Sequence, residues 1–566
     1  MIDNAVEKTT GRLLLVGAPL TTLFLVTETV TDPVNATKLF IAGGVGFALV
    51  AVALVFNSDY LWDHFKHIIA ATLLFNLAAL NSILNSDAPL TQNLYGAYGR
   101  NTGFVTYLIL SFIAIGALSL RDKNSFKKII VGLQFAGLVN VLYCAWVLAF
   151  GDFIGWSNPY GKILGLFGNP DFISAFLGIF NATVFAMALT PKFSWTKRFV
   201  AGILILLSFF EIVKSHAIQG IVVTAGGFVL VLFFWLRSKF QNKMITLTYS
   251  LIVTATGMLA VLGAFQKGPF SFVYKTSVSL RGAYWNAGLT MGMNHPLTGV
   301  GMDSYGDWYR RARSLDAATV LPGPNTITNA AHNVVIDFFA YGGFPLLISY
   351  LLILALAAFA AIRIIRRSHS YDSTFVAMFS AWACYQVQSI ISINQIGLAI
   401  WGWLLSGALI SYEFVTRTNV SDHKSSSKNH SLKVAPAHRI ISPQLVAGVG
   451  IVIGLMIAVP PLSADSKWRS ALKSANAQKV MDALQPGLMN PADSSRYSQA
   501  VQLFITNNLP DQAHQIAIKA SKYNPNYFDA WKIIYFIEPT TPSEKELALR
   551  NMKRLDPLNP DVTAQP

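Results

Sequence analysis

Residues 39–56 read LFIAGGVGFALVAVALVF, a run of 18 residues without a charged side chain. A helix of this length spans about 27 Å, close to the roughly 30 Å thickness of the hydrocarbon core of a bilayer. The whole chain has the same character, since 53% of its 566 residues are hydrophobic and 13% are charged. Soluble domains carry roughly 25% charged residues. The sequence therefore predicts an integral membrane protein.

Apolar runs of similar length recur along the chain, and we expect an all-α, polytopic membrane bundle of about thirteen transmembrane helices. The first run could be mistaken for a signal peptide, but it lacks an obvious small-residue cleavage site, so we expect it to be retained. The runs begin near Leu13, Leu39, Ile68, Phe104, Ile129, Phe172, Phe199, Ile221, Met244, Pro345, Phe375, Gly397 and Pro443.

Basic residues collect in alternate loops, which predicts the orientation because cytoplasmic loops hold an excess of Lys and Arg. One set of loops carries 21 basic residues and the opposite set of short loops carries four, so we expect a cytoplasmic N-terminus. The net charge of +15 is then explained by topology, and we expect no nucleic-acid partner. The basic set comprises the N-terminus and residues 57–67, 121–128, 191–198, 237–243, 363–371 and 414–440.

This orientation divides the chain into a membrane domain and an external domain. We expect a transmembrane domain with an external loop, a basic cytoplasmic linker, a last transmembrane helix and an external C-terminal domain. Their predicted ranges are 1–415 with the loop at 267–344, then 416–441, 442–462 and 463–566.

The C-terminal domain contains a repeated dipeptide. Asn490-Pro491, Asn524-Pro525 and Asp556-Pro557 recur at spacings of 34 and 32 residues. This period resembles tetratricopeptide helix hairpins, which stack into surfaces that bind proteins, so we expect a possible protein partner here. Unrelated amphipathic helices with proline stops are the alternative.

The external loop 267–344 combines arginines, aromatic residues and two histidines, His295 and His332. Guanidinium groups grip phosphate oxygens in pairs, and aromatic rings stack on the apolar faces of sugars. The mixture favours binding of an anionic, sugar-containing ligand over a purely structural loop. The two cysteines lie in apolar runs and predict neither a disulfide framework nor a thiolate metal site.

The same loop resembles the O-antigen ligase and polymerase superfamily. The resemblance rests on the ordered set Arg281-Gly-Ala-Tyr-Trp285, Pro296-Leu-Thr-Gly299-Val-Gly301, His332-Asn333 and Gly342-Gly343. Two further external segments, 98–103 (YGRNTG) and 166–171 (LFGNPD), are similar to segments of that family.

This resemblance implies a GT-C-type helical bundle that takes a glycan from undecaprenyl diphosphate, a polyprenyl-diphosphate donor, at the outer face of the bacterial cytoplasmic (inner) membrane. The acceptor would be lipid A core sugar, a growing glycan as in a polymerase, or a protein hydroxyl as in a protein O-oligosaccharyltransferase. The family needs no metal or other cofactor, and its enzymes invert the anomeric centre.

The resemblance also implies roles for individual residues. His332 would be the general base that takes the proton of the acceptor hydroxyl, and Asn333 would orient the ring or a sugar hydroxyl. Arg281, aided by Arg100, would stabilise the departing diphosphate. The alternatives are a helix-capping histidine and arginines that anchor at lipid headgroups.

The remaining candidates contact substrate in this interpretation. Trp285, Arg310 and Arg311 would face the glycan or, for the two arginines, lipid headgroups. Where the family has a Ser-Arg-Gly-like turn, this chain reads Lys214-Ser-His216-Ala-Ile-Gln-Gly, so Lys214 or His216 would replace that arginine. Lysine lacks the two-pronged geometry of arginine, which weakens the assignment.

Two functions of another class fit many spans and basic residues. A lipid-linked oligosaccharide flippase would have cations within the bundle and two pseudo-repeated halves, neither of which the sequence suggests. A scaffold would use the bundle only as an anchor for the C-terminal domain.

Overall fold

The computed structural model describes residues 2–271, 276–422 and 441–565, and these residues form an all-helical protein without β-strands. The predicted fold class is thereby confirmed. The elements are α1 (Ile2–Leu23), α2 (Asn35–Leu84), α3 (Leu90–Tyr95), α4 (Phe104–Leu118), α5 (Lys123–Phe150), the 3-10 turn η1 (Gly165–Phe167), α6 (Pro170–Ala188), α7 (Trp195–Lys214), α8 (Ile218–Phe240), α9 (Lys243–Ala264), α10 (Thr276–Asn294), α11 (Tyr305–Ala312), α12 (Leu315–Thr319), α13 (Val334–Arg367), α14 (Ser373–Ile391), α15 (Ile396–Asp422), α16 (Pro443–Lys473), α17 (Ala477–Ala483), α18 (Ser494–Thr506), α19 (Pro510–Tyr523), α20 (Phe528–Phe536), α21 (Pro542–Leu555) and α22 (Pro560–Thr563).

Every predicted apolar run lies in a helix. Among the described residues, eight helices are long and apolar enough to cross a membrane, namely α2, α5, α6, α8, α9, α13, α15 and α16. The helix α4 is apolar but shorter, and the runs that begin near Leu13, Phe199 and Phe375 lie in α1, α7 and α14. The protein is a multi-pass helical membrane protein, and the number of thirteen crossings stays a prediction.

Two predicted runs share α2, which folds back on itself at Phe65, where the backbone leaves the helical conformation. Both limbs contact α4 at a similar depth. Leu49 of the first limb packs against Gly116, and Asn76 of the second limb donates a 3.0 Å hydrogen bond to the Ser111 hydroxyl. The run boundary predicted near residues 57–67 is therefore a bend within one continuous element.

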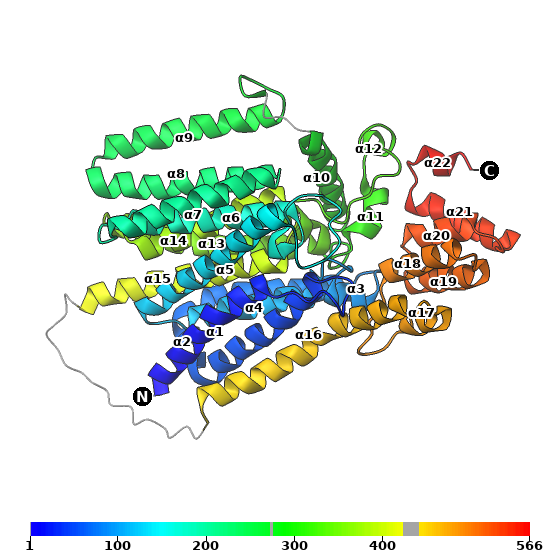
Figure 1. The fold of residues 1–566 in the computed structure, drawn as a ribbon, viewed down its shortest axis with the longest axis horizontal. Coiled ribbons are helices and arrows are strands. Elements are labelled where there is room, and N and C mark those ends of the chain that lie inside the picture. Colours follow the sequence, from blue (N-terminus) through cyan, green and yellow to red (C-terminus); the bar gives the residue numbers. More distant parts are fainter. Residues whose placement is uncertain (1, 272–275, 423–440, 566) are drawn as a thin grey trace.

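The long helices lie side by side, with the N-terminus at one end of the bundle and α10, α11, α12 and the C-terminal helices at the other (Figure 1). The predicted loop 267–344 and the C-terminal domain are thus neighbours in space. We call this end of the bundle the site end.

Two helices continue past predicted domain boundaries, and the division into domains stays a prediction. The helix α15 continues to Asp422, so residues 416–422 belong to it rather than to the predicted linker 416–441, most of which lies outside the described residues. The last membrane helix does not stop at residue 462, because α16 runs on to Lys473 and places Trp468 in the core of the C-terminal domain. One continuous helix therefore joins the bundle to that domain (Figure 1).

The C-terminal helices begin where the sequence offers start signals. Proline occupies the first turn of α19, α21 and α22, where its missing N–H is no loss. Thr541 and Glu544 form a reciprocal capping box on α21. Small residues such as Ala513, Ala517 and Ala548 are buried between the helices. Two packed helix pairs result, α18 with α19 and α20 with α21, while the tetratricopeptide interpretation stays a prediction.

A buried ion-pair cluster fixes the C-terminal domain to the loop. The Arg313 Nη2 atom lies 2.7 Å from Asp556 Oδ1, and both side chains are fully buried. Arg310 Nη1 lies 2.9 Å from the other oxygen of the same carboxylate, and Asn559 donates a further hydrogen bond to it. This carboxylate therefore joins α11 to the end of α21.

Further hydrogen bonds fix the domain to the segment 85–103. Asp493 accepts a 3.2 Å hydrogen bond from the Tyr98 N–H, and Asp465 accepts one of 2.9 Å from the Tyr98 hydroxyl. The Thr91 and Tyr523 hydroxyls lie 2.6 Å apart. The C-terminal domain is thus docked onto two separate segments of the site end.

We predict that Asp556→Ala loosens this docking. Both arginines would remain buried without their carboxylate, which costs about 3–5 kcal/mol for a buried pair. Hydrogen–deuterium exchange of residues 313–324 and of α21 should become faster. The matched control is Glu546→Ala on the same helix, because its pair with Arg550 is 73% exposed on both sides and should be dispensable. Equal exchange in the two variants would contradict the prediction.

Candidate active site

His332 lies at the site end, immediately before the first residues of α13. Its backbone has φ of +57°, a left-handed conformation that histidine adopts more readily than most residues. The chain is fixed on both sides of it. The Asn333 side-chain oxygen accepts a 3.0 Å hydrogen bond from the Val335 N–H, and Asp337 Oδ1 accepts one of 2.7 Å from the Ala331 N–H. These contacts impose the direction in which the imidazole leaves the backbone.

Asn333 has a different observed role from the one predicted for it. Its side-chain oxygen caps α13 by accepting hydrogen bonds from the N–H groups of Val335 and Ile336, at 3.0 and 3.3 Å. The residue is 6% exposed. Asn333 therefore positions His332 through the backbone, and its predicted contact with the ring or a sugar stays a prediction.

The imidazole of His332 rests against α10. It stacks on the ring of Tyr284, with centroids 5.6 Å apart and an angle of 29° between the planes. The two helices approach closely because a Cβ atom on Gly288 would lie only 2.6 Å from the Ile336 side chain. The histidine ring is thus held by packing as well as by its backbone.

The surroundings keep His332 neutral. Burial and, to a smaller extent, the positive charges of Arg100 and Arg281 together lower the pKa of His332 to about 4. The ordinary value is about 6.5, so the ring has lost its proton throughout the neutral range. The structure thereby brings together the three residues for which we predicted catalytic or diphosphate-binding roles.

Arg100 reaches the site from the segment between α3 and α4. Its Nε atom lies 3.9 Å from Asp303 Oδ1, and its side chain is 11% exposed. Within the described part of the chain this Nε has no hydrogen-bond partner. The guanidinium is therefore held beside a carboxylate.

Arg281 belongs to α10, and its positive charge acts on His332. It is half-buried, and burial lowers the pKa of its guanidinium while the negative charge of Asp171 opposes this shift. Asp171 stands in the first turn of α6, where the Asn169 side chain accepts a 2.8 Å hydrogen bond from its N–H. The predicted external segment 166–171 thus contributes charge next to Arg281.

The glycines of the loop motif allow two chain segments to touch. A Cβ atom on Gly299 would lie 2.2 Å from the Tyr341 backbone, and one on Gly343 would lie 2.3 Å from the Pro296 carbonyl oxygen. Both glycines have positive φ. The Gly301 N–H donates a 3.1 Å hydrogen bond to the Tyr341 carbonyl. As expected, the glycines form a tight turn, and this turn packs against the break in α13.

Sequence reasoning missed Asp303 and Tyr341. The Asp303 carboxylate accepts hydrogen bonds from the Ala97 N–H at 2.8 Å, the Thr102 hydroxyl at 3.1 Å and the Tyr341 hydroxyl at 3.2 Å. The signal available in the sequence was an acidic residue directly after the Gly299-Val-Gly301 turn, in a loop otherwise rich in arginine.

Arg310 and Arg311 are not brought together with His332. Arg310 pairs with Asp556 and lies over the Phe528 ring, 4.2 Å from its centroid. Arg311 lies over the Trp308 ring at 3.6 Å. The structure places Arg310 in the contact with the C-terminal domain, which accounts for its charge without a substrate.

The other three residues that we predicted to contact substrate are Trp285, Lys214 and His216. The Trp285 indole N–H is buried beside the site without a hydrogen-bond partner among the described residues, so it is a donor available to a ligand. Lys214 and His216 are exposed between α7 and α8, and the Lys214 amine lies 5.4 Å from the Phe210 ring centroid. The structure gives these two no contact with His332.

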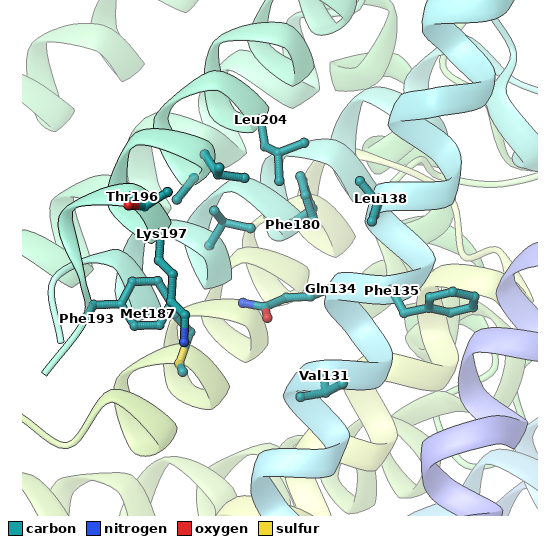
Figure 2. Close-up of a pocket in the computed structure, with 13 residues that line it drawn as sticks. Val131, Gln134, Phe135, Leu138, Phe180, Met187, Phe193, Thr196, Lys197 and Leu204 are labelled. Atoms are coloured by element: carbon teal, nitrogen blue, oxygen red, sulfur yellow. The ribbon is translucent and has the colours of Figure 1, made fainter.

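The structure also has a cavity that lies away from the predicted site residues. It has a volume of about 470 Å³ and opens between α5, α6 and α7. Figure 2 shows its mostly apolar walls, with Gln134, Thr196 and Lys197 as polar members. None of the predicted site residues lines it. Its composition suits lipid chains rather than the chemistry of a glycan.

One segment of the chain is similar to a known protein family. Residues 203–351 match a family model described as O-Antigen ligase. The matched segment contains Arg281, Trp285, His332 and Asn333, whereas Arg100 lies before it. A search among curated proteins gives no match. The fold defines the class as a multi-pass helical membrane protein, and the match of this segment to the O-antigen ligase model supports an activity of the glycosyltransferase type.

We predict that Arg281→Gln raises the pKa of His332. A cation near an imidazole disfavours the protonated ring, so removing it makes protonation easier and shifts the pKa upward from about 4. Diethyl pyrocarbonate attacks neutral imidazole, and peptide mass spectrometry of His332 modification against pH would locate the midpoint. The variant should show a higher midpoint than the wild type.

Arg311→Gln is the matched control. It removes a guanidinium from the same loop, but Arg311 is not among the charges that act on His332. Its midpoint should coincide with that of the wild type. An Arg281→Gln midpoint equal to the wild-type value would show that the two side chains are not electrostatically coupled.

Proposed function

We propose that the protein is an inverting glycosyltransferase that moves a glycan from undecaprenyl diphosphate to an acceptor hydroxyl, as an O-antigen ligase does. The observation that carries the proposal is a neutral imidazole, His332, flanked by the guanidinium groups of Arg281 and Arg100. A base and two cations at the end of a membrane bundle are what a lipid-linked diphosphate substrate requires.

The proposed reaction has one displacement step. His332 takes the proton of the acceptor hydroxyl while that oxygen attacks the anomeric carbon of the donor sugar. The bond between this carbon and the phosphate oxygen breaks, and its electron pair leaves on the diphosphate. Arg281 and Arg100 stabilise the negative charge that develops there, and the Trp285 N–H donates to a substrate oxygen. No cofactor takes part in the proposed step.

The proposed location is the outer face of the bacterial cytoplasmic membrane. The positive-inside distribution of Lys and Arg supports a cytoplasmic N-terminus and an external site end. A site at the end of a helical bundle suits a donor whose long lipid stays in the bilayer while its diphosphate reaches the interface.

Three acceptors fit this chemistry, and the ligase reaction onto lipid A core sugar is our first choice because of the family match. A polymerase would use a second lipid-linked glycan, and a protein O-oligosaccharyltransferase would use a Ser or Thr hydroxyl. All three would share the same donor site and the same base.

We predict that purified protein in nanodiscs transfers glycan from undecaprenyl diphosphate to one of these three acceptors. Mass spectrometry would identify the acceptor that gains sugar. His332→Ala should reduce the rate by roughly 100-fold or more, because a positioned general base contributes roughly 10²–10⁴-fold.

The matched control is His295→Ala. His295 lies in the same loop and packs against the Trp308 ring with centroids 4.8 Å apart, away from the two arginines that act on His332. It should retain most of the activity. Equal rates in the two histidine variants would refute the assignment of the base, and transport of the donor without transfer would favour a flippase.

A further inference from the structure

A second cavity lies between the membrane domain and the docked C-terminal domain. Its volume is about 180 Å³, and it is walled by residues of the segments 92–98, 303–329 and 493–529. The two domains therefore form it jointly. The buried Arg313–Asp556 pair fixes the distance between its walls.

The walls of this interdomain cavity have the composition of a sugar site. Tyr98, Tyr527 and Phe528 contribute aromatic rings, while Asn329 and Asn526 contribute amide groups. Rings pack against the C–H faces of sugars, and amides can both donate to and accept from their hydroxyls. The cavity differs in this respect from the apolar groove between α5, α6 and α7 (Figure 2).

Three of the four carboxylates in the walls, those of Asp303, Asp307 and Asp493, are already engaged by hydrogen bonds, and the fourth, Asp529, lies 3.9 Å from the Arg310 guanidinium, so the cavity does not call for a cation. Asp493 caps α18 and accepts from the Tyr98 N–H. Asp307 accepts from the Gln92 and Asn524 amides. Among the described residues no group of three or more acidic, histidine or cysteine side chains converges as a metal site would require. An uncharged, hydroxyl-rich ligand is the better match.

The size of the cavity restricts the ligand further. Sites for drug-sized molecules have volumes of roughly 300 Å³ or more. A cavity of about 180 Å³ is smaller than this and suits a single sugar ring. The rest of an oligosaccharide would extend from the opening.

The position of the cavity indicates which of the two substrates, the donor or the acceptor, it would hold. Asp303 lines the cavity and also pairs with Arg100, so the cavity adjoins the Arg100 side of the site. Arg281 does not line the cavity and lies near Asp171 of the membrane helix α6. A lipid-linked donor would approach along the membrane helices, which leaves the cavity for the acceptor.

We propose that the interdomain cavity binds one neutral sugar ring of the acceptor glycan, so that the C-terminal domain forms half of the acceptor site. This inference rests on the proposed function for its assignment to the acceptor. Binding of a sugar ring by the cavity can be tested without that function.

The test removes two polar side chains that line the cavity without dismantling the docking contact. Asn329 is exposed, and the Asp529 side chain is 37% exposed. Asp529 comes no closer than 3.9 Å to Arg310, whereas Asp556 lies 2.9 Å from that arginine and holds it in place. The variant is Asn329→Ala with Asp529→Ala.

The matched control is Asn325→Ala with Asp511→Ala. Asn325 belongs to the same loop as Asn329, and Asp511 occupies the first turn of α19 as Asp529 occupies that of α20. Neither Asn325 nor Asp511 lines the cavity. Comparable thermal unfolding of the two double variants would establish that both are folded.

The kinetic test uses the acceptor that the wild type glycosylates. The KM of the cavity variant for this acceptor should be roughly tenfold higher than that of the wild type, which is the loss of affinity expected from removing about one or two hydrogen bonds. Its KM for the donor and its kcat at saturating acceptor should stay within about twofold of the wild type, and the control should match the wild type. An unchanged acceptor KM, or a raised donor KM instead, would overturn the proposal.

Binding is measured separately on an array of neutral, lipid-free bacterial oligosaccharides with protein in nanodiscs. The wild type and the control should bind, and the cavity variant should lose that binding. If the wild type transferred no glycan, retained array binding that depends on Asn329 and Asp529 would support the sugar site and refute only the proposed function. Array binding that is absent, or equal in all three proteins, would overturn the sugar site itself.

Discussion

The buried carboxylate of Asp303 is the group through which the site end is assembled. It receives hydrogen bonds from Ala97 and Thr102 of the segment 85–103 and from Tyr341 of α13, and it pairs with Arg100. A buried ion is tolerated only when such partners replace its water. Loss of one member of a buried pair leaves the other charge uncompensated, at about 3–5 kcal/mol. The contacts of this one carboxylate therefore hold together segments that are about 200 residues apart in sequence.

The charged groups around His332 suit the proposed chemistry. Asp303 holds Arg100, and Asp171 lies near Arg281. The imidazole of His332 is kept neutral because burial and both guanidinium groups oppose its protonation. A neutral base can accept a proton at neutral pH, and cations placed beforehand need no reorganisation when charge develops on a leaving group.

The C-terminal domain is part of the same assembly rather than a flexible appendage. The helix α16 enters it without interruption, and the Arg313–Asp556 pair closes the contact from the loop. Arg310 takes part in this contact and also lines the interdomain cavity, and its predicted contact with substrate stays a prediction. The docking creates the interdomain cavity beside Asp303, so the geometry of the membrane domain and that of the C-terminal domain are linked.

The sequence by itself determined that the protein is a helical membrane bundle, because long apolar runs have no other stable arrangement in lipid. Its resemblance to the O-antigen ligase and polymerase superfamily also singled out His332, Arg281 and Arg100. The tertiary structure decided that α2 bends back at Phe65, that α16 continues into the C-terminal domain, and that Asp303 joins the site. It also decided which arginines face His332 and which face Asp556. The local pattern of apolar and polar residues indicates whether a segment prefers lipid or water. The partner of a buried charge depends instead on how segments that are distant in sequence pack together.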